Sequence, residues 1–225
     1  MGEKGLNTRA EILRAYNDLV YEKGIKRVTV RAIAKRAGVS IGNLYYYFKK
    51  KSDLGYALSR DYYAKVNIIL GECLTTSTKL EKVFVEYYTG ILLYCKIDAL
   101  HNYVLECADD LTLIEPQIEA LNPIVEKAIM EENLMICTKK IALATRALCV
   151  IHFTAHKFNH INGLEHIPRE YFKLICGVFF SILQLPAKPY TDRMLKHIEQ
   201  LDEKYIIDQI YTLQNYDYEF LGEIN

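Results

Sequence analysis

Residues 28–54 read VTVRAIAKRAGVSIGNLYYYFKKKSDL, and this stretch decides the fold. Thr29 can cap a short helix that Gly38 ends, and Ser40 can begin a second short helix. The apolar residues recur at helical spacing, as Val30, Ile33, Ala34 and Ala37 in the first helix and as Leu44 and Phe48 in the second. Two short helices joined by a tight glycine-containing turn are the pattern of a helix-turn-helix.

The rest of the chain is also predicted to be helical. A helix over about residues 8–23 precedes the motif and starts with a capping box formed by Thr8 and Glu11. Ser52-Asp53 caps a long helix that reaches about residue 70. Further helices are predicted over residues 80–92, 99–109, 116–135, 139–161, 169–185 and 192–220. With only 11 glycines and 5 prolines in 225 residues, and no alternating strand segment, the sequence predicts an all-α fold.

Charge is divided unevenly along the chain. The whole chain is formally neutral, but residues 1–60 carry 13 Lys and Arg against 5 Asp and Glu, which gives that part a net charge of +8. The remaining residues therefore carry −8. A basic region at one end indicates a polyanionic partner such as nucleic acid, although a charge run is more often a solvated face.

Composition also bears on where the protein resides. The longest stretch without a charged residue, 174–187, is shorter than the roughly 20 apolar residues of a membrane helix. The N-terminal residues lack the apolar core of a secretory signal. None of the six cysteines forms a Cys-x-x-Cys pair, which favours reduced thiols. We therefore expect a cytoplasmic protein with no membrane partner.

The string I-A-x-x-A-G-V-S-x-G-x-L-Y-x-Y-F-x-x-K-x-x-L is present without a gap between Ile33 and Leu54. It closely resembles the DNA-binding head of the tetracycline-repressor (TetR) family of bacterial regulators, and the resemblance covers roughly residues 8–60. It implies a helix-turn-helix DNA-binding domain at residues 1–50 and a helical-bundle domain at residues 51–225 for ligand binding and dimerisation. It further implies a homodimeric transcription regulator, usually a repressor, that a small ligand releases from a palindromic double-stranded DNA operator, with no cofactor.

The second helix of a helix-turn-helix places its N-terminal residues near base edges in the major groove. Asn43 can bond an adenine in bidentate fashion, and Ile41 can touch a thymine methyl. The resemblance implies that Tyr45 holds a phosphate, whereas Tyr47 replaces a common His and can instead fill the core of the head. The predicted DNA-binding residues are Thr29, Arg31, Ser40, Ile41, Gly42, Asn43, Tyr45, Tyr46, Tyr47 and Lys51.

The remainder of the chain is rich in aromatic residues, with 18 Tyr and 8 Phe in the whole sequence but no Trp. This composition suits a largely apolar ligand held by a few polar groups. The candidate ligand-binding residues are Tyr87, Tyr88, Tyr103, Arg146 and His152. Arg146 has an alternative role, because a lone cation in an apolar helix can also pair with an acidic residue of a neighbouring helix.

The segment 171–185 is apolar nearly all round its circumference, which predicts burial on two sides and hence a second subunit. The candidate dimerisation residues are Phe172, Ile175, Phe179 and Ile182. The family resemblance implies that helices 139–161 and 169–185 pair with the equivalent helices of a second subunit in a four-helix bundle. We expect the long helix 192–220 to pack on this region or across the dimer.

His152, His156 and His160 are spaced four residues apart, with Cys149 one turn before them. Two histidines four residues apart on a helix can share a metal ion. Three such histidines span about 12 Å, which is too far for one ion, and no partner on a second helix is identifiable. We therefore predict no metal site, and a metal-responsive regulator remains an alternative. Because the sequence holds no nucleophile elbow, phosphate loop or dinucleotide fingerprint, we predict no enzyme. A DNA-organising or protein-binding helix-turn-helix protein without a ligand is the other alternative.

Overall fold

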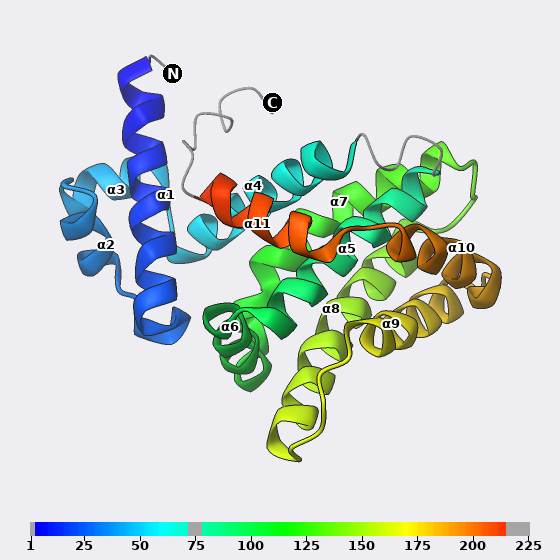
Figure 1. The fold of residues 1–225 in the computed structure, drawn as a ribbon. Helices are drawn as coiled ribbons and strands as arrows, with labels where there is room; N and C mark the ends of the chain where they lie inside the picture. The colour runs from blue at the N-terminus through cyan, green and yellow to red at the C-terminus, as the bar shows by residue number, and fades with distance from the viewer. Residues whose placement is uncertain (1–2, 72–77, 215–225) are drawn as a thin grey trace.

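The computed structural model describes residues 3–71 and 78–214, and these residues form helices and connecting segments without strands (Figure 1). The predicted all-α fold is therefore confirmed for the described residues. The helices run in the order α1 (Glu3–Lys23), η1 (Ile25–Arg27), α2 (Val30–Arg36), α3 (Ile41–Tyr47), α4 (Lys51–Gly71), α5 (Lys79–Lys96), α6 (Asp98–Asp109), η2 (Leu111–Ile114), α7 (Glu115–Glu131), α8 (Thr138–Ile161), α9 (Pro168–Leu183), α10 (Ala187–Glu199) and α11 (Glu203–Gln214). We call α1–α3 the head and the helices from α4 onward the body.

Local hydrogen bonds explain where the two short helices of the head begin. The hydroxyl of Thr29 accepts from the backbone N–H of Ala32 at 3.2 Å, and the hydroxyl of Ser40 accepts from that of Asn43 at 3.0 Å. Gly38, with φ of +66°, makes the turn between α2 and α3. The helix-turn-helix predicted from residues 28–54 is confirmed.

A small apolar core and the ion pairs of Arg36 with Glu22 and Asp18 of α1 hold the head together. Buried side chains from α1, α2 and the α3 end meet at its centre, namely Ile12, Leu13, Tyr16, Ile33, Leu44 and Phe48. At the surface, the guanidinium of Arg36 donates two hydrogen bonds to the carboxylate of Glu22, at 2.8 and 2.7 Å. This bidentate pair ties α2 to α1, so the reading helix α3 is carried on a compact three-helix unit.

The body is arranged around α5, which is buried on every side from Leu80 to Leu93 except for the half-exposed Lys82. Helices α4, α6, α7, α9, α10 and α11 all pack on it. In Figure 1, α11 crosses α4 and α5, and α6 lies on the side toward the head. None of the described helices is both long enough and apolar enough to cross a lipid bilayer.

Aromatic packing within the chain accounts for the apolar character of α9. The ring of Phe84 on α5 lies 6.4, 4.8 and 5.4 Å from the rings of Phe172, Phe179 and Phe180. Phe180 also stacks on Tyr190 of α10, with ring centroids 4.6 Å apart. Helix α9 is thus covered by α5 and α10 of its own chain.

This packing corrects the prediction about dimerisation. Phe172, Ile175 and Phe179 are 0% exposed in the single chain, so a second subunit cannot contact them. Only Ile182 of the predicted set remains partly exposed. Two-sided burial did not require a second subunit here, because α10 of the same chain covers the second side of α9. The apolar periodicity had merged α10 into the longer predicted helix 192–220.

The predicted helix beyond α9 also differs from the structure. The predicted single helix 192–220 is two helices, α10 and α11, separated at Gln200–Asp202, and α10 already starts at Ala187. The prediction that this region packs on the body is confirmed for its described part, because α10 contacts α9 and α5 and α11 contacts α4 and α5. Residues 215–220 lie outside the described residues.

Two boundaries also differ from the prediction. Helix α1 starts at Glu3, so Thr8 lies inside the helix and does not cap it. Helix α7 ends at Glu131, four residues early, since Asn133 adopts a left-handed φ of +56°. Cys95, Cys107, Cys137, Cys149 and Cys176 are free thiols, and Cys73 lies outside the described residues.

The body contains a buried carboxyl group, Glu86 on α5, which is only 4% exposed. Its Oε1 accepts a hydrogen bond from Nδ2 of Asn67 on α4 at 2.8 Å. Burial disfavours the ionised form and raises the pKa of Glu86 to about 7, although the amide of Asn67 and the nearby Lys82 oppose this shift. Glu86 therefore favours the folded state most when it is protonated.

We predict that Glu86→Gln stabilises the protein at pH 8 and has little effect at pH 4. The pKa of Glu86 is higher in the folded than in the unfolded chain, so folding loses stability as the pH rises from about 4.5 to 7. The full loss is about 3 kcal/mol, and glutamine keeps the acceptor for Asn67 without the charge. Urea unfolding from pH 4 to 8 measures the difference, with the exposed Glu119→Gln as control. A stabilisation that does not change with pH would contradict this assignment.

Candidate functional site

Helix α3 presents an exposed surface while its opposite side holds the core. Ile41, Tyr45 and Tyr46 are 40%, 43% and 68% exposed, and Leu44 is buried. Gly42 and Asn43 are exposed as well. A Cβ atom at Gly42 would meet only the hydroxyl of Ser40, at 3.9 Å, so the head itself does not require glycine there. Five of the six residues of this helix that are predicted to contact DNA, all except Tyr47, are therefore exposed.

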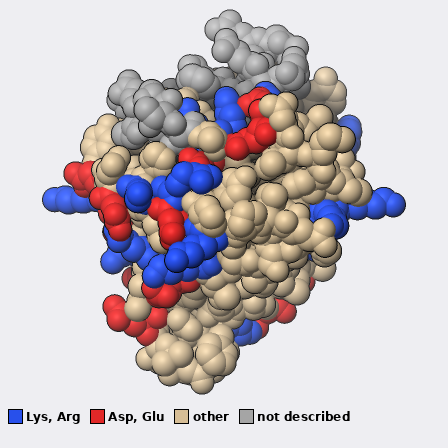
Figure 2. Space-filling view, turned by 90° about the vertical axis from the view of Figure 1, so that its right-hand side faces the viewer, with Lys and Arg blue, Asp and Glu red and all other residues tan. Residues whose placement is uncertain are grey.

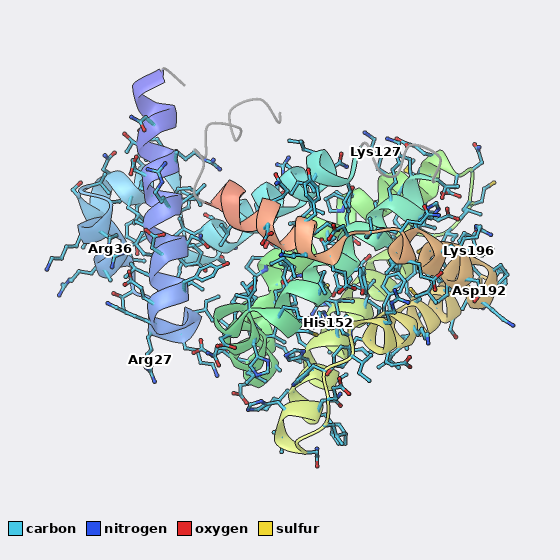
Figure 3. The ribbon with its side chains drawn as sticks, in the orientation of Figure 1. Arg27, Arg36, Lys127, His152, Asp192 and Lys196 are labelled. Atoms are coloured by element: carbon cyan, nitrogen blue, oxygen red, sulfur yellow. The ribbon has the colours of Figure 1, made fainter. Side chains whose placement is uncertain are left out.

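The other predicted DNA-binding residues lie around α3. Arg31 is exposed on α2, whereas the hydroxyls of Thr29 and Ser40 cap their helices. Tyr47 is half-buried and packs against the core of the head, with its ring 5.1 Å from that of Tyr46, which agrees with its alternative, structural role. Figure 3 shows Arg27 and Arg36 extending from the same part of the molecule.

Lys51 has a partner inside the protein. Its Nζ donates to the carbonyl oxygen of Ile25 at 2.9 Å, and burial lowers the pKa of its ammonium group. Two of its three N–H donors remain for other acceptors. Lys51 therefore links the start of α4 to η1, and its predicted contact with DNA stays a prediction.

The head meets the body at α6. The carboxylate of Glu106 accepts from the backbone N–H of Lys26 at 3.0 Å, and the ammonium of Lys26 lies 3.6 Å from Asp109. Gly24, with φ of +79°, allows this approach, since a Cβ there would lie 2.1 Å from Oε1 of Glu106. A displacement of α6 would therefore act directly on η1 and the end of α1.

A cluster of aromatic side chains fills the region where α5, α6 and α8 meet. Tyr94 lies at its centre, with its ring 6.4 Å from Tyr103, 5.6 Å from His152 and 5.8 Å from Phe153. Tyr87 Oη lies 3.3 Å from Nδ1 of His152. The structure thus brings together three of the predicted ligand residues, Tyr87, Tyr103 and His152.

His152 is the distinctive polar group of this cluster, and Figure 3 shows it within the body. It is fully buried, and its Nε2 makes no hydrogen bond with the described residues. Burial lowers the pKa of His152 to about 3, so the imidazole is neutral at physiological pH. A buried polar atom without a partner is rare in folded proteins, which makes His152 the candidate polar group for a bound molecule.

The structure does not bring the other two predicted ligand residues to this cluster. Tyr88 points to another side of α5, where its ring packs on Phe172 and its hydroxyl donates to Glu203 at 2.9 Å. Arg146 is exposed and donates two hydrogen bonds to Glu115, at 2.7 and 2.6 Å, as its alternative structural role predicted. Tyr94 was missed, although it lies seven residues after Tyr87 and so on the same face of α5.

Helices α8 and α9 leave an apolar surface uncovered. The exposed apolar residues of α8, α9 and the segment between them are Leu143, Phe158, Ile161, Leu164, Ile167 and Leu174. Figure 2 views the end of the molecule where α9 and α10 lie, and shows charged side chains gathered on one side beside a broad area without them. These residues make α8, α9 and their connection a candidate interaction surface.

Four histidines meet near the C-terminal end of α8. Nε2 of His156 lies 2.8 Å from Nδ1 of His101, and Nε2 of His101 lies 3.2 Å from Nδ1 of His160. His166 packs on His156 with ring centroids 4.1 Å apart. A partner on a second helix was not identifiable from the sequence, and the structure supplies one, His101 of α6.

Comparisons with known proteins agree with this geometry. Residues 12–58 match the sequence profile of the bacterial regulatory proteins of the tetR family. The probable HTH-type transcriptional regulator ArpR of Pseudomonas putida is 27% identical over 124 residues, which cover 51% of this chain and 59% of that protein. The HTH-type transcriptional regulator TtgR, also of Pseudomonas putida, is 39% identical over 56 residues, covering 25% of this chain and 27% of TtgR.

Structural similarity extends over the body. The crystal structure of RolR in complex with the ligand resorcinol superposes with a TM-score of 0.56 at 14% identity, covering 85% of this chain and 95% of RolR. At this identity the likeness shows the fold. The match to ArpR spans little more than half of that regulator, and the match to TtgR about a quarter of its length.

Proposed function

We propose, on the premise that this chain is a TetR-family transcriptional regulator, that it is a homodimeric repressor released from a palindromic operator by a small, largely apolar ligand. Residues 1–50 bind DNA in this proposal, and residues 51–225 bind the ligand and form the dimer. The observation that carries the DNA-binding part is the exposed face of α3, which leaves Ile41, Gly42 and Asn43 accessible at the start of the helix. We propose no catalytic role.

Two heads reading one operator require two copies of the chain. We propose that the exposed apolar surface of α8 and α9 is the dimer interface, because it offers several large apolar side chains that none of the described residues covers. Ile182 of α9 remains part of the proposed interface. Phe172, Ile175 and Phe179 do not, because they are buried within the chain. The heads must then be held about 34 Å apart to enter successive turns of the major groove.

The aromatic cluster around His152 is the proposed ligand site. A neutral imidazole with a buried, unpartnered Nε2 can bond a hydroxyl or carbonyl group, while Tyr94, Tyr103 and Phe153 suit an aromatic or other apolar skeleton. RolR, whose fold is similar, is known with resorcinol, a small aromatic diol. This likeness supports phenolic compounds as the first class to test.

The route from ligand to DNA in this proposal is α6. Tyr103 of the cluster and Glu106 at the head lie three residues apart on this helix. A ligand that favours a shifted α6 would move η1 and change the spacing of the heads. The ligand can change the free energy of DNA binding by no more than the difference between its binding free energies for the two positions of α6. Such differences are typically about 1–3 kcal/mol.

We predict that a phenolic ligand releases the protein from its operator and that His152→Phe reduces this response roughly 5- to 30-fold. The variant removes the proposed hydrogen bond to the ligand, worth about 1–2 kcal/mol, and keeps an aromatic ring in the site. It also removes the contact of His152 with Tyr87, so the variant is compared with and without ligand. Fluorescence anisotropy of a labelled operator, selected from random duplexes, measures DNA affinity with and without each compound. Unchanged DNA affinity of His152→Phe in the absence of ligand is the control. Equal sensitivity of both proteins to the active compound would reject the proposed site.

We predict that Asn43→Ala changes the preferred base at one position in each half-site. Loss of a bidentate contact to a base costs about 1–3 kcal/mol at that base pair alone. Tyr45→Phe, which removes a hydroxyl proposed to contact a phosphate, should weaken binding to all sequences alike. Selection from a random library gives the consensus of each variant. An identical consensus for the wild type and Asn43→Ala would show that Asn43 does not read a base.

We predict that Phe158→Asp yields a folded monomer. Phe158 is 60% exposed in the single chain, so the substitution leaves the fold intact but places an unpaired charge in the proposed interface. Met130→Asp is the matched control, since Met130 is 67% exposed on α7, outside the proposed interface. Sedimentation velocity at micromolar concentration measures the mass. If Phe158→Asp sediments as a dimer with the wild type, the interface lies elsewhere.

A further inference from the structure

Four of the six histidines of the chain gather at one place that the proposed function does not use. His101 comes from α6, His156 and His160 from α8, and His166 from the segment that joins α8 to α9. Their rings lie close together, with centroids of His101 at 4.8, 5.0 and 5.2 Å from those of His156, His160 and His166. Three separate segments of the body therefore contribute imidazoles to one cluster.

The ring nitrogens of these histidines face one another, with Nε2 of His101 3.2 Å from Nδ1 of His160 and Nδ1 of His101 2.8 Å from Nε2 of His156. A neutral imidazole keeps a lone pair on one ring nitrogen, and that nitrogen is the atom that binds a metal ion. No acidic side chain hydrogen-bonds to these rings among the described contacts, so the lone pairs are the main polar feature of the cluster.

The spacing of the nitrogens fits one ion. One ligand atom each from His101, His160 and His166 can be chosen so that all three lie within 4.8 Å of one another. Nε2 of His101 and Nδ1 of His160 are already 3.2 Å apart. Two ligands at about 2.0–2.1 Å from a tetrahedral zinc ion lie about 3.3 Å apart, so this pair needs almost no movement. His166 lies outside the helices, on the segment between Ile161 and Pro168, where a small adjustment can complete the triangle.

Hydrogen bonds from behind the rings orient the proposed ligands. Nδ1 of His101 faces Nε2 of the fully buried His156 at 2.8 Å, and Nδ1 of His166 faces the hydroxyl of Tyr171 at 2.8 Å. When each Nδ1 carries the proton and donates it to this partner, Nε2 of His101 and of His166 is left with its lone pair directed away from that partner. Metal-binding histidines usually have such a partner, which fixes the tautomer and the ring orientation.

We propose that His101, His160 and His166 bind one zinc ion, with His156 and Tyr171 as positioning residues. Three imidazoles select zinc and related transition-metal ions over Ca²⁺ and Mg²⁺, which require oxygen ligands. Because His160 is partly open to solvent at the surface, the fourth coordination position faces solvent and takes a water molecule or an additional ligand.

The proposed ion would join α6 to α8 and to the connection between α8 and α9. Helix α6 is the element whose Glu106 contacts the head, five residues after His101. Zinc would therefore restrain the helix that couples the body to the head, and it should change the affinity for the operator. This consequence rests on the proposed function, whereas zinc binding itself does not.

The test uses the full chain without a histidine tag, freed of metal with a chelator. Zinc titration by calorimetry should show one ion per chain with a dissociation constant in the micromolar range or below. His101→Ala, His160→Ala and His166→Ala should each weaken binding at least about tenfold, and His156→Gln should weaken it about 10- to 100-fold. His197→Ala, on α10, is the matched control and should bind as the wild type does. Circular dichroism verifies the fold, and the exposed His160→Ala is the variant least able to disturb it.

Cobalt substitution gives an independent readout, since a four-coordinate Co²⁺ site has intense visible absorption bands that a surface-bound ion lacks. These bands should be present in the wild type and absent from His160→Ala.

No zinc binding, or zinc binding that the three alanine variants leave unchanged, would overturn the proposal and make the cluster a hydrogen-bonded packing feature. Operator affinity measured with and without zinc then decides the coupling separately, because unchanged affinity with bound zinc would reject the coupling and leave the site.

Discussion

The near-complete burial of α5 is the constraint on which the arrangement of the body depends. A helix that is apolar and enclosed over more than three turns needs neighbours on every side, and α4, α6, α7, α9, α10 and α11 supply them. Phe84 shows how this works, because one ring on α5 contacts three rings of α9. The same helix presents Tyr87 and Tyr94 to α8 and α6, so the proposed ligand site is built on a helix that its neighbours enclose.

The head depends on the body at only a few polar contacts among the described residues. Glu106, Asp109 and the carbonyl of Ile25 form links between α6, η1 and α4 through Lys26 and Lys51. Within the head, the bidentate pair of Arg36 and Glu22 and a small apolar core hold α1–α3 as one unit. In the proposed mechanism, a change in the body would therefore move the head as one unit. The reading surface of α3 would then keep its shape.

Features encoded in neighbouring residues could be predicted from the sequence, whereas features that depend on distant residues could not. Thr29, Gly38 and Ser40 mark the helix-turn-helix through bonds within three residues, and the family resemblance rested on the same short string. The break at Gln200–Asp202 between α10 and α11 has no proline or glycine to signal it. The burial of Phe179 and the meeting of His101 with His156 depend on contacts across 95 and 55 residues, which periodicity along one helix cannot reveal. Of the candidate ligand residues, Tyr87, Tyr103 and His152 lie in one cluster, whereas Tyr88 and Arg146 have partners elsewhere.

The aromatic cluster has an optical consequence. The chain contains 18 tyrosines and no tryptophan, so its intrinsic fluorescence comes from tyrosine alone and is not passed on to an indole ring. Tyr87, Tyr94 and Tyr103 surround His152, and a bound aromatic molecule whose absorption overlaps tyrosine emission would lie within energy-transfer range of all three emitters. The protein therefore carries its own spectroscopic reporter at the interior where a ligand would act. A single tryptophan introduced elsewhere would stand out against a background that contains none.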